Sequence, residues 1–237
     1  EHDLPFWRAF GIFLDGLAST QSGTAGGGLE DMRRGLELLR EQSALLFDGL
    51  LKIALAEAEA RTGNVDRALT ILDEALTTCD RIGHRSFEAE LHRVRGEILL
   101  TRSPTNPARA EEAFLTAIGV SEQQGTRTFR LRAALSLARL YQSTARPVEA
   151  HTVLAPAVEG ILSPRRRAGD DGLAGPDDGS GTPTFDPSPK QNRHKADAAA
   201  LLEIVEAQAL LVTVRALSVS SRNGTKLGRV QRGPKAR

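Results

Sequence analysis

The sequence predicts an all-α fold, a right-handed α-solenoid of about four helix hairpins followed by a disordered linker and a C-terminal helix. Three observations support this prediction. A pattern of small and large apolar residues recurs every 40 to 42 residues. Apolar residues make up 40% of the 237 positions but aromatic residues only 4%, so the core has to be built from alanine and leucine. Between residues 163 and 195 the composition changes to proline, glycine and charged residues.

The recurring pattern is a small residue, a larger apolar residue four positions later, and a second small residue three positions after that. Its copies begin 40, 42 and 40 residues apart, and they are Gly28-Met32-Gly35, Ala68-Leu72-Ala75, Ala110-Phe114-Ala117 and Ala150-Leu154-Ala157. This spacing places all three residues on one face of a helix. We therefore expect each copy to be the second helix of a hairpin, with its small residues at the closest approach to the first helix.

A second series of small residues predicts the first helix of each hairpin. Its members are Gly11, Ala56, Gly96 and Ala138. A large apolar residue follows three positions later in three copies, whereas Glu59 stands there in the second copy and makes it the least typical. One hairpin cannot bury its own apolar stripe, but stacked hairpins share a continuous core.

The predicted helices cover residues 4–19, 28–41, 43–62, 65–82, 87–102, 107–124, 127–144 and 147–161. Turn residues set several of these boundaries. Asn64 is expected to cap the fourth helix, and Pro107 and Pro147 are expected to open the sixth and eighth. Gly83 and Gly125 are typical of helix C-termini, so they are predicted to end the fourth and sixth helices.

The small-large-small pattern on paired helices resembles the tetratricopeptide repeat, whose period is about 34 residues. More narrowly, several strings resemble the C-terminal region of bacterial multidomain proteins identified as predicted ATPases or adenylate/guanylate cyclases. These strings are LPFW at 4–7, ALTILDEAL at 68–76, EAELHRVRGE at 88–97, LRAALSLARL at 131–140 and EAHTVLAP at 149–156. The resemblance covers about residues 4–160. It implies that this chain is part of a longer protein whose ATPase or cyclase domains lie outside it.

Composition divides the chain into four parts. Residues 1–162 are the helical-repeat domain, and 163–195 are a disordered linker because they have too few apolar residues to form a core. Residues 196–219 form an amphipathic helix that is a candidate cap for the last hairpin, and 220–237 are a basic disordered tail. The region from Arg215 to Arg237 has seven basic residues, no acidic one and no aromatic residue to stack on bases, so we do not expect a nucleic-acid interface.

No group of residues predicts a catalytic, cofactor-binding or metal site, and we expect the chain not to be an enzyme. The glycine-rich segment 23–28 lacks the lysine that a phosphate-binding loop requires. The five histidines are dispersed and lack the spacing of metal ligands. Cys79, the only cysteine, is expected to be a buried apolar residue, and a single thiol favours a cytoplasmic location. We expect no membrane span, because charged residues interrupt the longest apolar stretch, 198–219.

Partner-binding residues are expected on the concave face, which the first helices of a solenoid line. Helical spacing from the packing residues gives Arg8, Glu57, Arg61, Glu90, Arg93, Glu97, Arg132 and Arg139. The alternative is an ordinary solvated surface with ion pairs within each helix, since Glu57 and Arg61 are four residues apart and Glu90 and Arg93 are three apart.

The leading functional hypothesis is a non-catalytic module that binds a protein or peptide segment, with the catalytic domains of its own parent protein as one candidate partner. A rival is a ligand-sensing repeat domain of an ATPase-type transcriptional regulator. That function requires a pocket with aromatic walls, and Trp7 and Tyr141 lie far apart in the array and are expected to be packing residues. A second alternative is a fragment of an adenylate/guanylate cyclase whose catalytic domain lies outside this chain.

Overall fold

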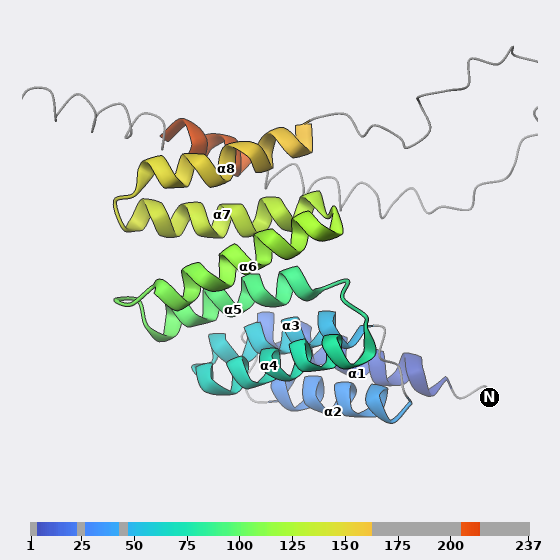
Figure 1. Cartoon of the computed structure of the whole chain (residues 1–237). Coiled ribbons are helices and arrows are strands. Elements are labelled where there is room, and N and C mark those ends of the chain that lie inside the picture. The colour runs from blue at the N-terminus through green and yellow to red at the C-terminus, as the bar shows by residue number, and fades with distance from the viewer. Residues whose placement is uncertain (1–3, 23–26, 43–46, 163–204, 214–237) are drawn as a thin grey trace, which may run out of the picture.

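The computed structural model describes residues 4–22, 27–42, 47–162 and 205–213. Within these ranges all regular structure is helical, and Figure 1 shows the helices stacked in successive pairs from the N-terminal end. This arrangement confirms the predicted α-solenoid of helix hairpins. Its helices are α1 (Pro5–Gln21), α2 (Gly28–Glu41), α3 (Asp48–Arg61), α4 (Val65–Ile82), α5 (Glu88–Arg102), α6 (Ala108–Gln124), α7 (Arg127–Ser143) and α8 (Pro147–Leu162).

The helix ends follow the predicted turn residues with two differences. Gly83 and Gly125 follow α4 and α6 in the left-handed conformation, with φ of 70° and 65°. Pro107 lies just before α6 rather than inside it. Asn64 precedes α4, but its side-chain oxygen accepts no capping hydrogen bond from that helix, and its side-chain amide nitrogen donates to the Glu59 carboxylate at 2.9 Å. The predicted start of the third helix, residues 43–46, lies outside the described residues.

The core is built mainly from alanine and leucine and runs through the stack as two clusters. The first cluster contains residues of α1 and α2 and the residues of α3 that pack against them. The second extends from α3 to α8. Ile71 of α4 packs against both clusters, so the apolar core continues from one hairpin to the next.

The close approach between α1 and α2 is at Gly16, not at Gly11 as the sequence pattern predicted. A methyl group on Gly16 would lie 2.5 Å from the Gly28 carbonyl oxygen and 2.7 Å from the Met32 nitrogen. A methyl group on Gly11 would have no neighbour within 4 Å. The prediction was wrong because Gly11 matched the local pattern of a small residue beside a larger one, which does not establish which helix face points toward α2.

When Gly16 is taken as the reference residue of α1, the small residues of the first helices have a regular spacing. The corresponding residues are Gly16, Ala56, Gly96 and Ala138, spaced by 40, 40 and 42 residues. Gly16 precedes the first small residue of its partner helix by 12 residues, as Ala56 and Ala138 do. Positions in α1, α3, α5 and α7 can therefore be compared by their distance from this residue.

A ninth helical segment, residues 205–213, lies at the α7–α8 end of the stack (Figure 1). Ala207 is fully buried in the second core cluster, and Leu210 and Leu211 pack against that cluster. This segment falls within the predicted C-terminal helix 196–219. The rest of that helix, the predicted linker 163–195 and the predicted tail 220–237 lie outside the described residues.

Candidate functional site

Six of the eight predicted binding residues lie close together on the first helices α3, α5 and α7. We call Glu57, Glu90, Arg93, Glu97, Arg132 and Arg139 the charged ladder. Its central ion pairs run from helix to helix. Arg93 of α5 lies 3.8 Å from Glu57 of α3 and 2.8 Å from Glu90, and Glu90 lies 2.7 Å from Arg132 of α7.

The ladder continues toward the C-terminal end. Glu97 lies 3.6 Å from Arg93 and accepts a 2.5 Å hydrogen bond from the Ser136 hydroxyl of α7. Arg139, also on α7, pairs with Glu206 of the segment 205–213. Charged side chains therefore connect α3, α5, α7 and the C-terminal segment across one face.

Burial differs along the ladder. The Glu90 and Arg93 side chains are only 6% and 12% exposed, whereas those of Glu57, Glu97 and Arg139 are 42% to 49% exposed. Burial, the largest influence, lowers the pKa of Arg93, but the hydrogen bond to Glu90 and the charges of Glu90, Glu97 and Glu57 together raise the pKa above its usual value. Burial raises the pKa of the Glu57 carboxyl, against the opposing effect of Arg93. The centre of the ladder thus pairs side chains of neighbouring helices, and its outer side chains are partly exposed to solvent.

The other two predicted residues lie outside the ladder. Arg61 is exposed at the end of α3, where its charge acts on Glu57. Arg8 is exposed near the start of α1 at the position that Asp48 and Glu88 occupy in α3 and α5. The error in the register of α1 is the reason that the sequence pattern grouped Arg8 with the ladder.

Apolar residues take the ladder positions at the N-terminal end, which the sequence pattern missed. Leu17 of α1 corresponds to Glu57 and Glu97, and Leu50 of α3 corresponds to Glu90. Leu17 is half-buried, and Leu50 is 43% exposed. The face therefore changes from apolar at α1 to charged at α5 and α7. The 12-residue spacing from Gly16 to Gly28 was the signal in the sequence that could have revealed this.

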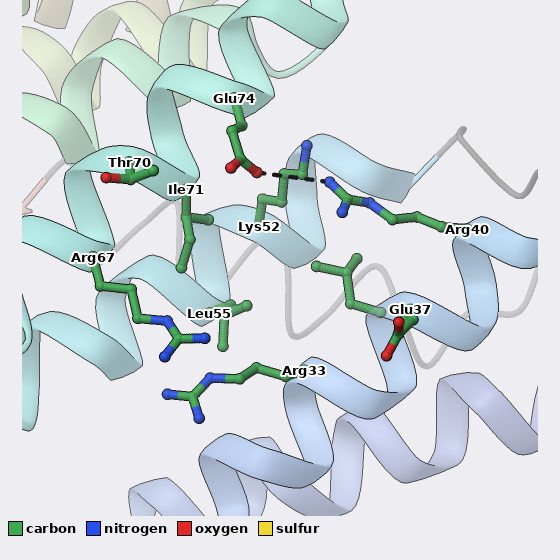
Figure 2. A pocket seen from close by; sticks show the side chains of 10 residues that line it. Arg33, Glu37, Arg40, Lys52, Leu55, Arg67, Thr70, Ile71 and Glu74 are labelled. Atoms are coloured by element: carbon green, nitrogen blue, oxygen red, sulfur yellow. Dashed lines mark ion pairs between the residues drawn. The ribbon is translucent and has the colours of Figure 1, made fainter.

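Glu59, the atypical residue of the second hairpin, is fully buried and ties α2, α3 and α4 together. Its carboxylate accepts hydrogen bonds from Arg33 of α2 at 2.5 and 3.0 Å and lies 3.2 Å from the Arg67 guanidinium of α4. Figure 2 shows the guanidinium groups of Arg33 on α2 and Arg67 on α4 pointing toward one another. Asn64 donates the further hydrogen bond described above. The acidic residue thus replaces an apolar contact with a polar one.

A cavity of about 310 Å³ lies between α2 and α4, and residues of α3 also line it. Its lining residues are Arg33, Leu36, Glu37, Arg40, Lys52, Leu55, Arg67, Thr70, Ile71 and Glu74 (Figure 2). Lys52 is 1% exposed and pairs with Asp48 at 2.8 Å, and Arg40 lies 4.0 Å from Glu74. The lining carries no aromatic side chain, and its cations have nearby carboxylates, so the cavity offers neither a stacking wall nor an unbalanced charge to a ligand.

A polar cluster joins the last two hairpins. The Tyr141 hydroxyl donates to Glu111 at 2.8 Å, and Arg146 lies 2.9 Å from the same carboxylate and stacks over the Tyr141 ring. Burial, and then the bond to Glu111, raise the pKa of Tyr141 to about 12. The Arg146 hydrogen bond holds the pKa of Glu111 below its usual value. Tyr141 is therefore a packing residue, as predicted.

The sequence also singled out Cys79, His92 and Trp7, and the structure gives the surroundings of each. Cys79 is buried, as predicted, and burial raises the pKa of its thiol. Burial, and then Arg95, lower the pKa of His92. Trp7 is 62% exposed and contacts Phe6 and Phe10 edge-on, so it is not the core residue that was expected.

Two features are absent from the described residues. No group of histidine, cysteine, aspartate or glutamate side chains in them is arranged to hold a metal ion. None of their helices is both long and apolar enough to cross a bilayer.

Comparison with known proteins gives matches only among solved structures. No family model and no curated protein matches the chain. It is similar to the nearly identical TPR-like repeats of a putative kinesin light chain from Podosopora anserina, with a TM-score of 0.53, 18% identity and coverage of 92% of this chain and 98% of that one. A glutamine-to-methionine variant of that protein has the same TM-score, with 16% identity and coverage of 94% and 100%. These likenesses show that the chain has the fold of a TPR-like helical-repeat protein.

Proposed function

We propose that this chain is a non-catalytic helical-repeat module that binds a protein or peptide segment across α3, α5 and α7. The charged ladder is the observation that supports this function. It places side chains of both signs from three consecutive first helices on one continuous face, and solenoids use such extended faces to bind. The accessible outer charges favour a charged peptide over a lipid or a sugar.

The polarity of the face defines the peptide further. Its α1 end offers Leu17 and Leu50, and its α7 end offers Arg132 and Arg139. A segment with an apolar residue at one end and acidic residues at the other matches this order. Arg132 and Arg139 already pair with Glu90 and Glu206, so an acidic peptide would compete with these carboxylates.

The biological setting in this proposal comes from the sequence resemblance. We propose that the module is the cytoplasmic regulatory C-terminal part of a bacterial signalling protein of the ATPase/cyclase type. Its partner would then be the catalytic domains of that protein or a segment of another one. Turnover of ATP or production of a cyclic nucleotide by this chain alone would contradict the non-catalytic assignment.

Small-ligand sensing has less support than peptide binding. The cavity between α2 and α4 has no aromatic wall. Trp7 lies on α1 and Tyr141 on α7, so the two aromatic candidates do not form one site.

The proposal can be tested with a displayed library of random peptides selected on the immobilised chain. Affinities of the enriched peptides are then measured by fluorescence polarisation for the unmodified chain and for Glu97→Lys combined with Arg139→Glu. We expect the double substitution to weaken binding by about tenfold, equivalent to roughly 1.4 kcal/mol.

A matched control exchanges an ion pair away from the ladder. Arg102 of α5 lies 3.1 Å from Asp66 of α4, and both side chains are exposed. Asp66→Lys combined with Arg102→Glu reverses the same number of charges and should leave the affinity unchanged. Failure to enrich any peptide, or equal affinities for all three proteins, would contradict the proposed face.

A further inference from the structure

An apolar face of α1 is exposed at the N-terminal end of the stack. Trp7, Gly11, Leu14 and Ala18, which we call the end face, follow one another at helical spacing along one side of α1. Trp7 is 62% exposed and Leu14 44% exposed. In the described part of the chain nothing packs over Gly11, where an added methyl group would have no neighbour within 4 Å.

Two of the four positions, those of Gly11 and Ala18, are buried in the other hairpins, where they contact a neighbouring hairpin, whereas the position of Trp7 is only partly covered there, as Phe47 shows with 38% exposure. Gly11 corresponds to Leu51, Leu91 and Ala133, which are at most 4% exposed. Ala18 corresponds to Ala58, Ile98 and Leu140, which are also at most 4% exposed. Leu51 and Ala58 of α3, for example, pack against α1 and α2. The part of the end face around Gly11 and Ala18 therefore matches the surface that this fold uses to join one hairpin to another.

The end face is complementary to a second copy of itself. Large and small residues alternate along it. If two α1 helices cross antiparallel about a two-fold axis between residues 12 and 13, Trp7 faces Ala18 of the other copy and Leu14 faces Gly11. Each large side chain then meets a small one, which allows the close packing that helix interfaces require.

The flanking charges fit the same arrangement. Arg8 and Asp15 are exposed and lie seven residues apart along one edge of the end face. In the antiparallel pairing Arg8 lies about 3 Å along the helix axis from Asp15 of the other copy, within reach of its side chain. The opposite end of the stack is covered by the chain's own segment 205–213, where Ala207 is fully buried. A two-fold contact between end faces therefore requires no rearrangement there, whereas a head-to-tail contact would have to displace that segment.

We propose that two copies of this chain form a symmetric dimer through the end faces of their α1 helices, with Trp7 packed on Ala18 and Leu14 packed on Gly11. The contact leaves the charged ladder on α3, α5 and α7 free.

Analytical ultracentrifugation of the full chain tests the proposal. We expect the mass to depend on concentration and to rise toward twice the 25.5 kDa of one chain between about 1 and 100 µM. This corresponds to a dissociation constant in the micromolar range, as expected for a small interface. Gly11→Lys should leave a monomer at all of these concentrations. Gly119→Lys is the matched control, because Gly119 also lies inside a helix with no neighbour within 4 Å of an added methyl group. It should dimerise as the unmodified chain does, and circular dichroism checks that both variants fold.

A charge exchange tests the antiparallel geometry. Arg8→Asp or Asp15→Arg alone places like charges together twice in each dimer, and we expect either to weaken dimerisation by about fivefold. The double variant Arg8→Asp with Asp15→Arg should restore it. An unmodified chain that stays monomeric up to about 100 µM would overturn the proposal. The end face would then be expected to bind a helical hairpin that is not part of a second copy of this chain. A dimer that survives Gly11→Lys, or single charge variants that are not rescued by the double one, would overturn it as well.

Discussion

Glu59 is a carboxylate at a position where the third and fourth hairpins have Leu99 and Tyr141. Its burial is tolerated because Arg33 and Arg67 supply positive charge and Asn64 supplies a hydrogen bond. Such a cluster adds little net stability compared with an apolar contact, but it is costly to break once it has formed. Its effect is to hold α2 and α4 on either side of α3 by directional bonds.

Glu59→Leu is expected to destabilise the protein even though leucine is the residue of the third hairpin. The substitution leaves Arg33, which is 27% exposed, without its main partner, and the expected cost is about 3 kcal/mol in the free energy of unfolding measured in urea. Glu59→Leu combined with Arg33→Leu should recover part of this loss. A single variant as stable as the unmodified protein would show that the cluster does not hold these helices together.

A second prediction at this scale concerns pH. The Arg146 hydrogen bond, followed by that of Tyr141, lowers the pKa of Glu111 from the ordinary value of 4.5. A group whose pKa is lowered on folding contributes stability above its unfolded pKa, and that contribution is lost as the pH falls through its folded pKa. Glu111→Gln should therefore reduce stability at about pH 7 and make much less difference at about pH 3. Thermal melts across this range give the comparison, and a difference that is constant with pH would contradict it.

At the level of elements, the register between α1 and α2 depends on the absence of a side chain at Gly16. A methyl group there would lie 2.5 Å from a backbone oxygen and 2.7 Å from a backbone nitrogen, atoms that cannot move without shifting a helix. The opposite situation holds at Gly11, whose surroundings are open. The two glycines lie in the same helix, so the same substitution can be compared at a crowded position and at an open one.

Gly16→Ala should destabilise the protein by about 2 kcal/mol because it forces α1 and α2 apart. Gly11→Ala should stabilise it by about 0.5–1 kcal/mol, since alanine is the better helix former. Urea unfolding at low protein concentration measures both without a contribution from dimerisation. Equal effects of the two substitutions would contradict the register described here.

At the scale of the whole molecule, each hairpin contacts its neighbours, so the ends of the stack have to be protected separately. The segment 205–213 provides this at α7 and α8 through Ala207, Leu210 and Leu211. Because stability in a solenoid is a sum of neighbouring contacts, loss of one end should be felt locally.

Ala207→Glu should increase backbone hydrogen exchange in α7 and α8 and leave α1 and α2 unchanged, because it introduces a charge where the side chain is fully buried. Ala209→Glu, at an exposed position of the same segment, is the matched control and should change neither region. Hydrogen exchange followed by mass spectrometry resolves the two ends. An equal response to both substitutions would show that the segment does not protect the last hairpin.

Periodicity alone determined the all-α class, the pairing of helices and most of their boundaries, because residues at helical spacing must share a face wherever the helix lies. It also placed Glu57, Glu90 and Arg132 on one side of their helices. The tertiary structure decided what periodicity could not: that Gly16 rather than Gly11 approaches α2, that Glu59 has two arginine partners, and that Trp7 stays exposed. Each of these depends on residues distant in sequence, such as Arg33 with Glu59 or Gly16 with Gly28, and local spacing does not specify which faces of two helices meet.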